Sequence, residues 1–129
     1  MKASELRIGN FLKWEDETHD IIKVIGINES KTTNDFLITY KELLSETKGQ
    51  VYSFEFIPIP LTEDWLLKFG FEKRDGEIPE NIDFVFKGFW IEQQSDVDDF
   101  ICLNTEPFVS VEYVHQLQNL YYALTGEEL

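Results

Sequence analysis

The sequence has little cysteine, histidine and basic charge, and each shortage excludes a class of protein. One Cys among 129 residues rules out a disulfide within the chain, and two His without paired spacing leave no zinc-binding motif. There are 11 Lys and Arg against 25 Asp and Glu, a net charge of -14. Binding to nucleic-acid phosphates or to anionic lipids depends on clustered basic side chains. We therefore expect no direct binding to a phosphate backbone and no binding to membranes.

Long hydrophobic runs are also missing. A membrane-spanning helix needs about 20 apolar residues, and the longest runs here are only a few residues. The first seven residues, Met1 to Arg7, contain no apolar signal region. Together with the single cysteine, this predicts a cytoplasmic protein in a reducing environment.

What the sequence does contain is apolar material for a core. Hydrophobic residues make up 43% of the chain and aromatic residues 15%, enough for one domain or two small lobes. The acidic excess is uneven, because residues 1–58 have a net charge of -3 and residues 59–129 a net charge of -11. Such an excess favours solubility or a basic partner.

The first half of the chain reads as β-structure. Short apolar or alternating segments at 8–14, 20–27, 36–40 and 51–57 are separated by polar turns. In the last of these, Tyr52, Phe54 and Phe56 are expected on one face of a strand. Residues 41–47 also fit one or two helical turns. We predict an SH3-like small β-barrel over residues 1–57.

Two prolines, Pro58 and Pro60, mark the boundary of this lobe, because neither a helix nor an inner strand accommodates them. A helix is predicted at 62–69. Thr62 is its expected N-cap, acidic residues fill its first turn, and Gly70 ends it.

The rest of the second lobe, residues 58–129, is predicted as an antiparallel β-meander at 71–103 and a C-terminal helix at 111–125. The helix has a single apolar stripe, with Ser110 as its possible N-cap and Gly126 as its stop. The fold class is therefore α+β, with two tightly joined lobes. We expect both helices to pack on one face of the meander, because each has one apolar stripe to bury.

Three stretches resemble a family of small uncharacterised proteins from gut Bacteroidetes and their phages or prophages. They are Leu6–Asn10 (LRIGN), Pro58–Phe71 (PIPLTEDWLLKFGF) and Tyr113–Leu129 (YVHQLQNLYYALTGEEL). The resemblance implies a bacterial or phage origin. It implies no activity and no site residues.

One flank of the predicted C-terminal helix is polar, and it is the candidate partner surface. Its residues face away from the apolar stripe, and Tyr122 adds an aromatic contact of the kind that interfaces favour. The alternative is a solvated helix face, or one packed on the β lobe. The residues of this flank are His115, Gln118, Asn119 and Tyr122.

No catalytic, cofactor or metal motif appears in the sequence. A Cys102–His115 pair is the basis of one alternative, a small hydrolase. A second alternative is an acidic DNA mimic that inhibits a nucleic-acid-binding enzyme, with carboxylates about 7 Å apart along one surface. The leading hypothesis is a non-enzymatic accessory or protein-interaction module of phage or mobile-element origin, a monomer or weak homodimer with a protein partner and no cofactor.

Overall fold

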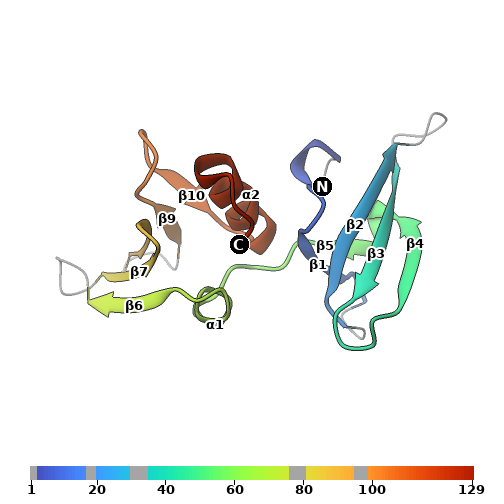
Figure 1. The fold of residues 1–129 in the computed structure, drawn as a ribbon, viewed down its shortest axis with the longest axis horizontal. Helices are drawn as coiled ribbons and strands as arrows, with labels where there is room; N and C mark the ends of the chain where they lie inside the picture. Colours follow the sequence, from blue (N-terminus) through green and yellow to red (C-terminus); the bar gives the residue numbers. More distant parts are fainter. Residues whose placement is uncertain (1–2, 17–19, 30–34, 76–80, 95–98) are drawn as a thin grey trace. The chain divides into compact units, whose positions relative to one another are not determined.

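The computed structural model describes residues 3–16, 20–29, 35–75, 81–94 and 99–129 (Figure 1). Two antiparallel five-stranded sheets and two α-helices confirm the α+β class. In chain order the elements are η1 (Ala3–Glu5), β1 (Phe11–Trp14), β2 (Ile22–Glu29), β3 (Phe36–Glu42), β4 (Lys48–Tyr52), η2 (Ser53–Glu55), β5 (Phe56–Ile57), α1 (Glu63–Lys68), β6 (Glu72–Asp75), β7 (Ile82–Phe86), β8 (Phe89–Gln93), β9 (Phe100–Cys102), β10 (Val109–Val111) and α2 (Val114–Thr125).

The chain forms two compact units, and the first is discontinuous. Unit 1 consists of Met1–Ile59 and Val114–Glu128, and unit 2 contains Pro60–Tyr113. The division between the units falls between Ile59 and Pro60, whereas the sequence predicts a boundary after residue 57. The C-terminal helix, however, is grouped with unit 1, where it contacts β1. The expectation that both helices pack on the meander stays a prediction. Polar contacts between α2 and the N-terminal segment, described below, account for the place of α2 in unit 1.

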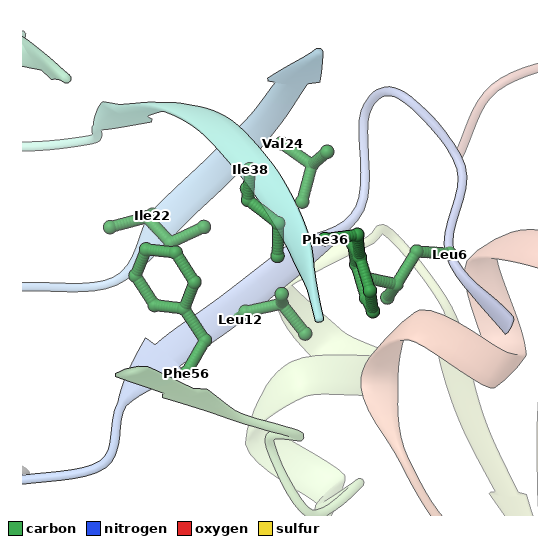
Figure 2. Close-up of a cluster of buried hydrophobic side chains, with 7 residues drawn as sticks. All are labelled: Leu6, Leu12, Ile22, Val24, Phe36, Ile38 and Phe56. Atoms are coloured by element: carbon green, nitrogen blue, oxygen red, sulfur yellow. The ribbon is translucent and has the colours of Figure 1, made fainter. Parts of the chain in front are cut away.

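The sheet of unit 1 has the order β4-β3-β2-β1-β5 and is open, with β4 and β5 as its edge strands. The closed SH3-like barrel is therefore not observed among the described strands. A bulge between Val24 and Gly26 interrupts the pairing of β2 with β3. One face of the sheet buries the core, whose side chains converge in Figure 2: Leu6, Leu12, Ile22, Val24, Phe36, Ile38 and Phe56.

Residues 36–57 differ in two ways from the sequence prediction. The segment 41–47 is not helical, because β3 continues to Glu42 and a turn leads directly into β4. The predicted strand at 51–57 is broken by η2. As a result Phe56 is buried, while Tyr52 and Phe54 are exposed and stack on each other, with ring centroids 5.8 Å apart and planes 8° from parallel. The three aromatic rings therefore do not share one face.

Unit 2 begins with α1, which forms as its sequence predicts. The Thr62 hydroxyl accepts a hydrogen bond from the backbone N–H of Trp65 at 3.4 Å. Gly70 ends the helix with a φ of +97°, a left-handed conformation that residues other than glycine rarely adopt. Phe71 then packs on Phe86 and Phe89 of the sheet.

The sheet of unit 2 has the order β10-β9-β8-β7-β6, so strands neighbouring in sequence are neighbours in space. This confirms the predicted meander. Lys87 and Gly88, both with positive φ, form the turn between β7 and β8. The sheet has one strand beyond the predicted meander, β10. It contains Ser110 and Val111, so α2 begins at Val114, and Ser110 is not its N-cap. The β-branched valines at 109 and 111 favour the extended conformation.

Candidate functional site

The polar flank of α2 does not form an open surface. His115 and Gln118 are only 2% and 3% exposed. The Gln118 side chain accepts a hydrogen bond from the backbone N–H of Phe11 at 2.9 Å and donates one to the carbonyl oxygen of Gly9 at 3.1 Å. Its amide therefore anchors α2 to the segment that leads into β1.

The other two residues of the flank face the same N-terminal segment. The Asn119 side chain accepts a hydrogen bond from Asn10 Nδ2 at 2.8 Å and donates one to the carbonyl oxygen of Glu5, also at 2.8 Å. The Arg7 guanidinium lies 3.6 Å from the centroid of the Tyr122 ring. Of the four candidate residues only Tyr122 remains substantially exposed, at 40%. This flank is therefore packed against the N-terminal segment, as in the alternative stated above. Two of the three stretches that carry the family resemblance, Leu6–Asn10 and Tyr113–Leu129, are in contact here.

The burial of His115 changes its acid–base properties. Desolvation lowers the pKa of the imidazole, and the nearby Glu5 carboxylate partly opposes this change. Neutral imidazole is thus favoured in the folded state. The buried position of His115 inside the helix face does not support the hydrolase alternative.

Cys102 is equally unsuited to nucleophilic chemistry. Its side chain lies in β9 with 0% exposure. Desolvation raises the pKa of the thiol, although the backbone N–H groups of Asn104 and Thr105 oppose this. Because the thiolate is the reactive form, a buried thiol with a raised pKa is inert.

Within the described ranges, no three His, Cys, Asp or Glu side chains come close enough together to hold a metal ion. Further residues of the types that bind metals, among them His19, Asp96 and Asp98, lie outside the described ranges. Nor does any helix of the described chain have the length and apolar character needed to cross a membrane.

The carboxylates among the described residues of unit 2 do not follow one line. Glu63 pairs with Lys73 at 2.8 Å, and Lys73 is in register with the buried Phe84. Asp83 and Glu92 are cross-strand partners on the opposite face of the sheet. Acidic groups on both faces, interrupted by a lysine, do not support the DNA-mimic alternative.

The most distinctive surface of unit 2 is the loop between β9 and β10. It surrounds a hollow of about 700 Å³ lined by residues 103–108. Phe108 is 65% exposed at its end, and the following Val109, in the edge strand β10, is 41% exposed. We call Phe108, Val109 and the hollow the Phe108 surface.

This loop is held in place by the side chain of Asn104. Its Oδ1 accepts a hydrogen bond from the backbone N–H of Trp90 at 2.7 Å, and its Nδ2 donates one to the carbonyl oxygen of Gly88 at 2.9 Å. The loop is thus tied to the end of the β7–β8 turn and to the start of β8, and Phe108 is presented from a braced segment. The sequence pattern did not predict this surface. Its one local signal was an aromatic residue directly after a proline, between two strands.

Comparison with known proteins provides no relative from which to transfer a role. No protein-family model matches the chain, no curated protein matches it, and no solved structure matches it.

Proposed function

We propose that this protein is a non-enzymatic interaction module that binds a protein partner through the Phe108 surface. The observation that carries the proposal is the exposure of the Phe108 side chain, at 65%, on a loop braced by Asn104. A large aromatic ring on a braced loop loses little conformational freedom on binding. Aromatic residues also supply much of the binding energy at interfaces.

The neighbouring elements suit the same role. The hollow beside Phe108 accepts a side chain from a partner, and the exposed Val109 extends the apolar area onto β10. As the outer strand of its sheet, β10 has backbone groups of the kind that pair with an added strand. The expected partner segment is therefore extended and carries an apolar side chain.

The proposed context is an accessory role in a phage or mobile element, in a bacterial cytoplasm. The support is the resemblance of the three stretches quoted above, together with the single buried cysteine.

The test is affinity capture from the bacterium that carries the gene, using the wild-type protein, Phe108→Ser and Leu44→Ser. Leu44 is the matched control, because it is 86% exposed in the β3–β4 turn of unit 1. We expect one partner to be retained by the wild type and by Leu44→Ser and lost with Phe108→Ser. Equal capture by all three proteins would contradict the proposal, as would turnover of a metabolite by a protein that captures nothing.

A further inference from the structure

We infer that unit 1 carries a binding face for single-stranded nucleic acid on the side of its sheet opposite the core. This inference is independent of the Phe108 surface, which lies in the other unit. It rests on the strand register, which places basic side chains from three separate strands in one row.

The row contains Lys23, Lys41 and Lys48. Lys23 of β2 is the direct partner of Lys41 in β3, and Lys41 is the direct partner of Lys48 in β4. The three strands run side by side (Figure 1). Because neighbouring strands are about 4.8 Å apart, the three Cα positions span about 10 Å. We call this side of the sheet the lysine face.

No described carboxylate on the lysine face of these strands neutralises the row. Strand positions on the lysine face carry lysine, neutral polar or apolar residues, and none of those described is acidic. Lys41 has one ion pair, at 3.9 Å, with Glu46 of the adjoining turn. Lys23 and Lys48 are exposed, and neither has an ion pair with any described residue. Like charges directly opposite each other destabilise a sheet. An anionic ligand bound between the lysines would reduce this repulsion.

An aromatic platform adjoins the lysines on β4. Lys48, Gln50 and Tyr52 point to the same side, because side chains alternate along a strand, and all three are exposed. They follow one another at about 6.8 Å. Tyr52 is 46% exposed and stacks on Phe54, which is 57% exposed. A basic row beside an exposed aromatic stack matches single-stranded nucleic acid, whose phosphates need cations and whose bases need flat surfaces.

The net charge of -14 does not prevent this binding. At physiological ionic strength, charges more than about 8 Å apart are largely screened from each other. A phosphate in contact with the lysine row therefore interacts mainly with those lysines and with Glu46, which lies 3.9 Å from Lys41. The expectation of no phosphate binding was based on the total charge, which hides a local basic face.

The test measures binding of fluorescently labelled dT20 and rU20 by anisotropy at several salt concentrations. Contact with three phosphates predicts a slope of log K against log salt of about -2, and each Lys→Gln change at 23 or 48 should flatten it by about 0.7. Tyr52→Ala should weaken binding about tenfold at constant slope. Lys87→Gln, in the β7–β8 turn of unit 2, makes the same change in net charge and should have no effect.

The two oligonucleotides distinguish DNA from RNA as the preferred strand, and binding of either supports the inference. A duplex of the same length and polyglutamate are the competitors, and both should compete poorly. The inference is overturned if neither oligonucleotide binds in 50 mM salt, or if Lys87→Gln weakens binding as much as Lys48→Gln. It is also overturned if polyglutamate competes as well as dT20, because the face would then bind acidic proteins. Circular dichroism of each variant confirms folding.

Discussion

Gln118 Oε1 accepts a hydrogen bond from the backbone N–H of Phe11 at 2.9 Å, joining residues 107 positions apart in the sequence. This contact makes the C-terminal helix part of the N-terminal unit. Gln118 also donates to the carbonyl oxygen of Gly9, so both ends of its amide are used. The polar side of α2 is thereby an internal surface of unit 1.

The first prediction concerns this amide. Gln118→Leu removes these two hydrogen bonds and a longer one from Asn10 Nδ2 at 3.5 Å, and it leaves the backbone groups of Phe11 and Gly9 without these partners. We expect the free energy of unfolding to fall by about 2 kcal/mol. Chemical denaturation measures the change. Gln116→Leu is the control, because Gln116 lies on the same helix but is exposed, and it should stay within about 0.5 kcal/mol of the wild type. Similar losses in both variants would contradict the role assigned to Gln118.

His115 predicts a pH dependence of stability. Burial lowers its pKa below the usual 6.5, so the unfolded chain binds a proton more readily than the folded one. The stabilisation is fully present above about pH 6.5 and is lost as the pH falls through the lowered pKa. Denaturation of the wild type and of His115→Gln between pH 7.5 and 5 measures it. The wild type should lose more stability than the variant, and parallel curves would show that the imidazole titrates equally in both states.

The burial of Cys102 predicts that its thiol reacts slowly in the folded protein. The native protein should react with a thiol reagent such as DTNB far more slowly than the protein in guanidinium chloride, where one thiol per chain should react. The physical reason is the complete burial of the side chain and the raised pKa of its thiol. Rapid reaction of the native protein would revive the hydrolase alternative.

Alanine substitutions at two glycines with positive φ measure the cost of backbone strain with and without a steric contact. A Cβ at Gly70 would lie 3.2 Å from the Phe86 ring, whereas a Cβ at Gly88 would have nothing within 4 Å. Gly88→Ala therefore incurs only the left-handed backbone cost, about 1 kcal/mol, and Gly70→Ala about 2 kcal/mol because the ring must also move. Thermal or chemical denaturation compares the two. Equal losses would mean that Phe86 yields without cost.

The features that could be predicted from the sequence depend on neighbouring residues. Thr62 and Gly70 mark the ends of α1 because capping involves residues three or four positions apart. The turn at Lys87 and Gly88 is local in the same way. The start of α2 was placed too early because Ser110 and Val111 pair with β9, which a helix pattern does not reveal.

The features that could not be predicted depend on distant pairing. The burial of Gln118 requires Phe11 and Gly9, and the basic row requires the register of three strands. For the same reason the burial of His115 and Gln118 in the candidate partner surface could not be predicted. An exposed helix flank and a buried one have the same sequence pattern, and only the contacts made by the remote segment distinguish them.

The most direct test of the proposed docking role is photocrosslinking in the organism that carries the gene. A benzoylphenylalanine residue replaces Phe108 in one strain and Leu44 in another, and crosslinked proteins are identified by mass spectrometry after irradiation. The account predicts one prominent crosslinked protein from position 108 that is missing from position 44. No crosslink at position 108, or the same set of proteins from both positions, would contradict it.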